Sequence, residues 1–168
     1  MAYKQVILGA AMAAFTFSLA ACGGEAATEG ASEAVAATTA APAEIEERQA
    51  TFKSLGKSFK AIRTQLESGS PDTAAILVSA TEMNAAAVKV GGLFPDGSSV
   101  DAGYDTEALA VIWEKPDEFA AAHQRLVDAT AEMMTIAEGG DVAAIGDQVG
   151  AVGGSCKNCH DNFRLDTD

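Results

Sequence analysis

Residues 141–163 read DVAAIGDQVGAVGGSCKNCHDNF, and this segment gives the clearest indication of the fold. Its apolar and cysteine side chains recur with alternating steps of three and four residues, which places them on one stripe of an α-helix. The members of this stripe are Val142, Ile145, Val149, Val152, Cys156, Cys159 and Phe163. Asp141 precedes the stripe and can cap the helix, because its carboxylate accepts hydrogen bonds from the first free backbone N–H groups.

Three segments upstream repeat this spacing, so each is also expected to form an amphipathic helix. Their apolar stripes are, in chain order, Ile45, Phe52, Leu55, Phe59, Ile62 and Leu66, then Ile76, Ala80, Met83, Ala87 and Val90, then Phe119, Ala122, Leu126, Ala129, Met133 and Ile136. Alanine, the strongest helix former, supplies much of the apolar content, and no alternating strand pattern competes.

Capping signals indicate where these helices begin and end. Ser70 is the expected N-cap of the second helix, with Pro71 at its first position, and Pro116 opens the third helix. The pairs Gly91–Gly92 and Gly139–Gly140 end the second and third helices. Residues 93–115 then form one long connection, with a short helix expected over residues 106–113. Two short links and one longer crossover predict an all-α fold, an antiparallel four-helix bundle.

The last helix carries a C-x-x-C-H motif, formed by Cys156, Cys159 and His160. The motif is typical of c-type haem attachment, in which two thiols bond to the haem vinyl groups and the imidazole ligates the iron. Residues three and four apart share one side of a helix, so the three side chains point the same way. We therefore predict one covalently attached haem c near the C-terminus, with His160 as the metal ligand.

Three other interpretations of the motif are open. A structural zinc site needs four ligands, and the remote His123 is the one candidate left to complete it. A thioredoxin-like redox pair lies at the start of a helix that follows a strand, whereas this pair lies late in a helix. A plain disulfide between Cys156 and Cys159 leaves His160 without a role.

The N-terminal segment predicts export. Lys4 supplies a positive start, and residues 6–21 form an apolar run that is short for a membrane span and fits a secretory signal. Residues 19–22, Leu-Ala-Ala-Cys, resemble the lipobox of bacterial lipoproteins, which implies lipidation of Cys22. The alternative is an ordinary signal peptide cleaved near Ala21. Because c-type haem is attached in oxidising export compartments, either signal supports the motif.

The predicted organisation has three parts. Residues 1–21 are a lipoprotein signal peptide, residues 22–43 a lipidated cysteine and flexible tether without large apolar side chains, and residues 44–168 the helical bundle. We expect a periplasmic protein held on a bacterial membrane by its acyl chains. The formal net charge of −13 argues against nucleic acid as a partner, because phosphate recognition depends on Lys and Arg.

Four segments carry a family resemblance: RQATF at residues 48–52, LFPDGS at 93–98, IW at 112–113 and VGGSCKNCHDNFR at 152–164. The chain thereby resembles cytochrome c prime, the class II c-type cytochromes, over about residues 44–165. The resemblance implies one haem c in a four-helix bundle, five-coordinate high-spin iron, and a homodimer formed through the first two helices.

The resemblance also implies which residues contact the haem. Cys156 and Cys159 form the thioether bonds, and His160 ligates the iron. The remaining expected cofactor-binding residues are Arg48, Gln49, Phe52, Phe94, Thr106, Glu107 and Arg164. Arg48 matches a position near a haem propionate, where its guanidinium can form a charge-assisted hydrogen bond. Arg164 follows the iron ligand by four residues and is expected to modulate ligand chemistry on that side.

Phe52 occupies the position from which six-coordinate relatives supply a methionine ligand. Phenylalanine cannot ligate iron, so we predict an open sixth position roofed by Phe52, with Phe59 and Phe94 nearby. The upstream residues able to ligate iron are Met83, Met133, Met134 and His123. Met83 and Met133 fall on apolar stripes and are expected to be core residues, whereas His123 is expected to be a solvated surface residue.

These features favour a haem protein, not an enzyme, that binds small gaseous ligands such as nitric oxide and/or carries electrons in the cell envelope. The alternative is a low-potential periplasmic electron-transfer cytochrome with no gas-binding role, whose acidic surface would suit a basic redox partner. A structural lipoprotein bundle without a cofactor is the third interpretation.

Overall fold

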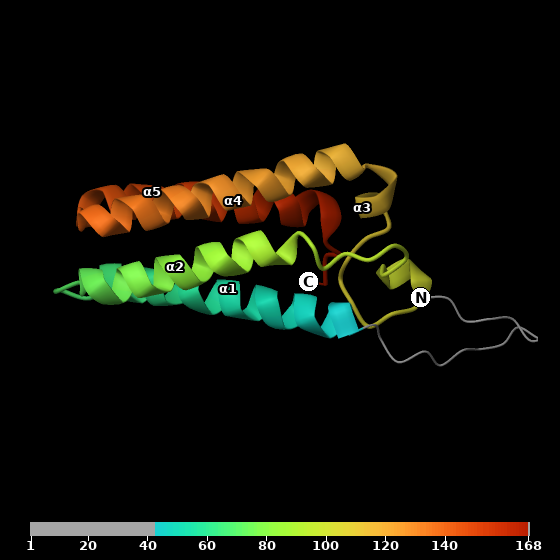
Figure 1. Cartoon of the computed structure of the whole chain (residues 1–168), viewed down its shortest axis with the longest axis horizontal. Helices are drawn as coiled ribbons and strands as arrows, with labels where there is room; N and C mark the ends of the chain where they lie inside the picture. The colour runs from blue at the N-terminus through green and yellow to red at the C-terminus, as the bar shows by residue number, and fades with distance from the viewer. Residues whose placement is uncertain (1–42, 168) are drawn as a thin grey trace, which may run out of the picture. The chain divides into compact units, whose positions relative to one another are not determined.

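The computed structural model describes residues 43–167, so the predicted signal peptide, the tether and Cys22 lie outside the described residues. Four long helices run in alternating directions (Figure 1): α1 (Ala43–Glu67), α2 (Thr73–Val90), α4 (Pro116–Gly139) and α5 (Val142–Phe163). α1 packs against α2, α2 against α4, and α4 against α5, whereas α1 approaches α5 at only a few residues. This arrangement confirms the predicted antiparallel four-helix bundle.

The helix boundaries follow the capping signals at all but one end. Gly140 ends α4 in the left-handed conformation (φ 68°), and Asp141 caps α5 through hydrogen bonds from the N–H groups of Ala143 and Ala144. The N-cap of α2 is Asp72, so the prediction of Ser70 was wrong. Gln65 explains the difference, because its side-chain oxygen accepts the Asp72 N–H at 3.1 Å and fixes the turn between α1 and α2.

The crossover between α2 and α4 contains the short helices η1 (Val100–Ala102) and α3 (Val111–Glu114). The predicted helix over residues 106–113 was therefore too long at its start. Residues 107–109 instead run alongside the chain that follows α5, with the Leu165 N–H 2.7 Å from the Glu107 oxygen and the Leu109 N–H 3.1 Å from the Phe163 oxygen. Tertiary pairing thus keeps the start of this segment out of a helix.

The bundle core is built from the predicted apolar stripes. Fully buried side chains from all four long helices form its main cluster, among them Ile62, Ile76, Met83, Met133 and Ile145. The prediction that both methionines are core residues is confirmed. None of the helices within residues 43–167 is at once long enough and apolar enough to cross a membrane.

A second, smaller cluster lies at the crossover end. Its buried members are Ala108, Ile112, Ala122 and Phe163, with partly buried aromatic side chains packed around them. This is the end of the bundle at which the C-x-x-C-H motif of α5 lies.

Candidate haem site

A cavity of about 740 Å³ opens between α1, α4, α5 and the crossover, within the size range of sites for small molecules and cofactors. All the expected cofactor-binding residues of the described chain line it: Arg48, Gln49, Phe52, Phe94, Thr106, Glu107, Cys156, Cys159, His160 and Arg164. They come from α1, the crossover and α5, so the fold brings together residues that lie more than 100 positions apart in the sequence.

The two motif thiols are half-buried on the cavity side of α5, and they form no disulfide. Burial raises the pKa of the Cys156 thiol. Burial, and secondarily the neighbouring Cys156, raises the pKa of Cys159 to about 11. A thioredoxin-like pair has the opposite property, a thiol with a lowered pKa. The site therefore argues against the redox-pair interpretation.

The zinc interpretation gains no support either. Within the described part of the chain, no three side chains of His, Cys, Asp or Glu converge on a metal-binding arrangement. His123 lies on α4, where its Nε2 donates to the Ala87 carbonyl oxygen at 2.8 Å.

His123 is half-buried and lines the cavity, so its prediction as a solvated surface residue was wrong. Gly91 gives the physical reason. A Cβ atom at this glycine would lie 2.3 Å from His123 Cε1, so the missing side chain makes room for the imidazole. The Gly91–Gly92 pair was recognised in the sequence only as a helix stop.

His160 has three charged neighbours, Arg164, Glu107 and Asp161. Arg164 Nη1 lies 3.4 Å from His160 Nδ1, and Arg164 Nε lies 3.2 Å from a carboxylate oxygen of Glu107. Partial burial lowers the pKa of His160, Arg164 lowers it further, and the acidic Glu107 and Asp161 oppose the shift. The net effect favours the neutral imidazole, which is the form that binds a metal.

Arg48 is the most deeply buried charged side chain at the site, 2 % exposed. Its guanidinium donates to Leu93 O (3.1 Å), Ser98 Oγ and O (both 3.0 Å) and Thr106 Oγ1 (2.8 Å). These acceptors are all neutral, and burial lowers the pKa of Arg48. A buried cation that lines a cavity and has only neutral acceptors suits an anionic group on the molecule that fills it.

The contacts of Arg48 also reveal a role that the sequence did not suggest. Arg48 and the neighbouring Gln49, whose Nε2 donates to the Asp105 carbonyl at 2.8 Å, tie α1 to the crossover. The Arg48 guanidinium lies 4.6 Å from the centroid of the Phe94 ring, so it also positions one wall of the cavity.

Aromatic rings form much of that wall. Phe52 and Phe94 have centroids 6.5 Å apart, Phe94 and Phe119 4.7 Å, and Phe119 and Phe163 5.3 Å, all with edge-on geometry. Phe119 and Phe163 were recognised from their apolar stripes, but their position beside the cavity was not. Their place at the helix ends nearest the crossover is the feature that could have indicated it.

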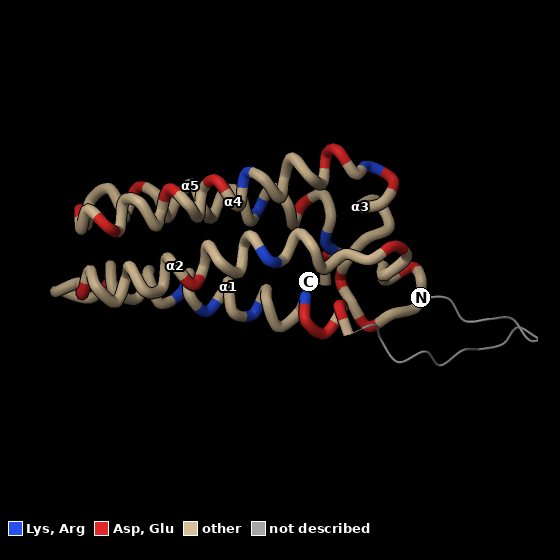
Figure 2. Tube along the Cα trace, in the orientation of Figure 1, with Lys and Arg blue, Asp and Glu red and all other residues tan. Residues whose placement is uncertain are grey.

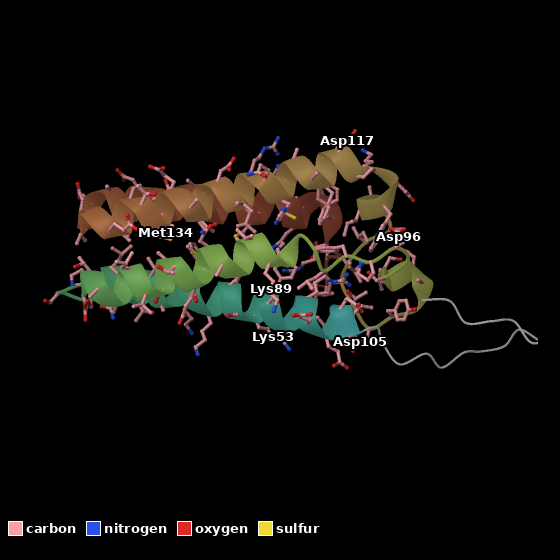
Figure 3. The ribbon with its side chains drawn as sticks, in the orientation of Figure 1. Lys53, Lys89, Asp96, Asp105, Asp117 and Met134 are labelled. Atoms are coloured by element: carbon pink, nitrogen blue, oxygen red, sulfur yellow. The ribbon has the colours of Figure 1, made fainter. Side chains whose placement is uncertain are left out.

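The residues able to supply a sixth iron ligand lie mostly elsewhere. Met83, Met133 and Met134 are absent from the cavity lining, and Met134 lies on α4 toward the end of the bundle away from the crossover (Figure 3). His123 does line the cavity, but its Nε2 is already bonded to Ala87. Phe52 and Phe59, which cannot ligate iron, occupy the α1 wall.

A four-helix bundle whose last helix presents two thiols and an imidazole to a cofactor-sized cavity defines a c-type haem protein of the bundle class. Residues 43–164 match the family described as Cytochrome C', and the chain belongs to this family. The family carries covalently bound haem c, one per chain, and the donor set and cavity described above fit that group.

Relatives cover the whole bundle. The cytochrome c' of Pararhodospirillum photometricum is 34 % identical over 120 residues, which is 71 % of this chain and 94 % of the relative. Among solved structures, a cytochrome c' from Rhodobacter Spheriodes has a TM-score of 0.68 at 30 % identity, covering 75 % of this chain and 98 % of the other. The Shewanella frigidimarina cytochrome c prime gives 0.69 at 29 % identity, covering 76 % and 98 %.

Proposed function

We propose that this chain binds nitric oxide, or another gas of similar size, at five-coordinate haem iron in the cell envelope. One observation carries the proposal: the α1 wall of the cavity presents Phe52 and Phe59, and no methionine within residues 43–167 lines the cavity. When bound, the haem supplies an iron atom with one open position at which a diatomic gas can bind.

Six of the predicted residues have defined roles in this proposal. Cys156 and Cys159 form the thioether bonds, and His160 ligates the iron from the α5 side. Arg48 and Gln49 hold the crossover in place, and Arg48 provides positive charge toward a haem propionate. Phe52 covers the open side and restricts it by size.

The apolar wall near Phe52 determines how ligands are selected. Three of the side-chain donors that line the cavity are already engaged, Arg48 with the crossover, Gln49 with Asp105 and His123 with Ala87, and Lys53 is an exposed side chain where the cavity reaches the surface. A diatomic ligand therefore gains little from hydrogen bonding there, and selection is steric. This favours a ligand that bonds strongly to iron over one that needs a polar pocket.

Structural neighbours support the proposal at the level of the fold. A mutant of cytochrome c prime from Alcaligenes xylosoxidans, 22 % identical with a TM-score of 0.66, is described as a nitric oxide complex. Another neighbour, 24 % identical with a TM-score of 0.68, is described as showing ligand-controlled dimer dissociation. We propose that this chain also dimerises through α1 and α2, with Val78 and Val88 of α2, which are 60 % and 57 % exposed, in the contact and the face of α1 beside the cavity left free.

The proposal extends to the N-terminal part of the chain. We place the mature protein in the periplasm, lipidated at Cys22 and joined to the membrane through residues 22–43. Gas binding by such an anchored protein would buffer nitric oxide near the membrane, and no further reaction by the protein's own side chains is required.

Two measurements on the same purified holoprotein separate gas binding from the alternative, a low-potential electron-transfer cytochrome without a gas-binding role. Nitric oxide titration of the ferrous protein should give a stoichiometric spectral change, whereas carbon monoxide should bind slowly. Efficient reduction in stopped flow without any nitric oxide response would contradict the proposal and favour the alternative.

Variants at Phe52 sharpen this test. Phe52→Ala should speed carbon monoxide association by about tenfold or more, because removing the steric barrier lowers the activation free energy by at least about 1.4 kcal/mol. Phe52→Leu is the matched control that keeps an apolar roof and should change the rate much less. Equal rates in the three proteins would show that Phe52 does not control access.

A further inference from the structure

Three exposed lysines lie on one face of α1, at Lys53, Lys57 and Lys60. Their spacing of four and three residues places them on a single stripe about 10 Å long, since an α-helix rises about 1.5 Å per residue. Figure 2 shows the basic segments along α1 in a molecule whose other helices carry many acidic segments. We call these three residues the α1 lysine stripe.

Among the described residues, the other exposed Lys and Arg side chains each form an ion pair except Arg125, which bonds to Asn158, whereas no side-chain partner is found for the stripe. The recorded ion pairs are Arg63–Glu67, Lys89–Glu47, Lys115–Glu118, Lys157–Asp161 and Arg164–Glu107. Within residues 43–167, no ion pair is recorded for a lysine of the stripe. The sequence holds 24 acidic against 11 basic residues, so three adjacent unpaired cations are a marked local reversal of charge.

The position of the stripe connects it to the haem site. Lys53 lines the cavity together with Gly56 and Phe59 of α1, and Gly153 and Cys156 of α5 line the same cavity. Lys53 and Gly56 are exposed, so the cavity reaches the surface beside the stripe. An approaching molecule attracted by the lysines would therefore meet the protein at a place where the cavity reaches the surface.

We propose that the α1 lysine stripe is the docking surface for an acidic electron-donor protein. The donor gives up one electron, and ferric haem in this chain becomes ferrous. The proposal rests on membership of the haem family and not on gas binding, so it stands or falls separately from the proposed function. It reverses the expectation from composition, that an acidic surface would recruit a basic partner.

The overall negative charge does not prevent such docking. The Debye length is about 10 Å at 0.1 M ionic strength, so charges farther away are largely screened while the stripe acts on a partner in contact. Electrostatic complementarity of this kind chiefly raises the association rate and fixes the orientation of a complex. On the same face of α1, Glu46 lies seven residues before Lys53, about two helical turns toward the N-terminus.

The test uses the holoprotein and fully reduced flavodoxin, an acidic one-electron donor, as the probe. The variant is Lys57→Glu with Lys60→Glu, which leaves Lys53 at the cavity unchanged. The control, Lys89→Glu with Lys115→Glu, alters the net charge equally but on other elements. At about 0.1 M ionic strength, where the rest of the molecule's charge is screened, the second-order reduction rate should fall about tenfold or more in the stripe variant and no more than about twofold in the control.

A binding measurement without electron transfer provides the second readout. Calorimetric titration with oxidised flavodoxin should show weaker binding and a weaker salt dependence for the stripe variant alone. Equal losses in both variants would overturn the proposal, because net charge would then be sufficient. A second result would also overturn the proposal. If the stripe variant loses binding to vesicles of phosphatidylglycerol and phosphatidylcholine but is reduced by flavodoxin at an unchanged rate, the stripe binds the membrane surface instead.

Discussion

The two ends of the bundle are packed differently. At the end where short turns join α1 to α2 and α4 to α5, the helices fill the space between them with their own side chains, and Ile62, Ile76 and Ile145 are fully buried. At the crossover end, the same helices leave a cavity of about 740 Å³ whose wall is partly buried aromatic rings. One half of the core is therefore complete in the polypeptide, and the other half needs the cofactor.

The difference shows how the chain divides its stabilising interactions. The closed end depends on apolar burial from the helical stripes. The crossover end depends on the hydrogen bonds of Arg48, the aromatic contacts and the covalent haem, because a group that binds only the folded state stabilises it. Substitutions at the two ends should therefore affect the holoprotein and the haem-free chain differently.

The largest expected effect comes from paired substitutions on α1. Ile62→Ala at the closed end should lower the free energy of unfolding by about 2–5 kcal/mol in both forms, because it opens a void in a filled core. Phe52→Ala at the cavity should cost less than about 1 kcal/mol in the haem-free chain, because its side chain already borders empty space. Urea unfolding of both variants checks this, and equal costs in the haem-free chain would contradict the division into two ends.

An intermediate effect is expected at Arg48. Arg48→Ala leaves the buried acceptors on Ser98 and Thr106 without their donor and should cost about 2–3 kcal/mol. The loss should appear as faster amide exchange in residues 93–106, with little change in α2. Arg48→Lys keeps the charge but cannot supply the same forked set of donors. It should therefore restore only part of the protection of residues 93–106 against amide exchange. Uniform loss of protection over the whole bundle would contradict a local role.

The smallest effect is expected at Gly91. In Gly91→Ala the new methyl group displaces the His123 ring and breaks its hydrogen bond to Ala87, at a cost of about 1–2 kcal/mol. In a His123→Ala background the same change should be nearly neutral, so a double-mutant cycle isolates the contact. Gly146→Ala on α5 is the control, because its added Cβ meets nothing within 4 Å. It should stabilise the helix by about 0.5–1 kcal/mol. If Gly91→Ala lowers the free energy of unfolding as much in the His123→Ala background as in the native chain, the contact between the new methyl group and the imidazole is not the cause.

Local patterns predicted the four long helices, because apolar periodicity and caps such as Asp141 act over a few residues. The start of α3, the position of His123 and the contacts of Arg48 could not be predicted in this way. Arg48 bonds to residues 45, 50 and 58 positions away, and the segment before α3 is held by residues beyond the end of α5. The motif and the family resemblance selected the residues around the cavity. The hydrogen bonds that support these residues join positions far apart in the sequence, so no local pattern indicates them.

The most direct test of the account is the electron paramagnetic resonance and optical spectrum of the ferric holoprotein at neutral pH. If Phe52 roofs an open position opposite His160, the spectra will be those of high-spin, five-coordinate iron, and nitric oxide will change them. Six-coordinate low-spin iron with a methionine charge-transfer band would contradict the account, as would purified protein without a Soret band.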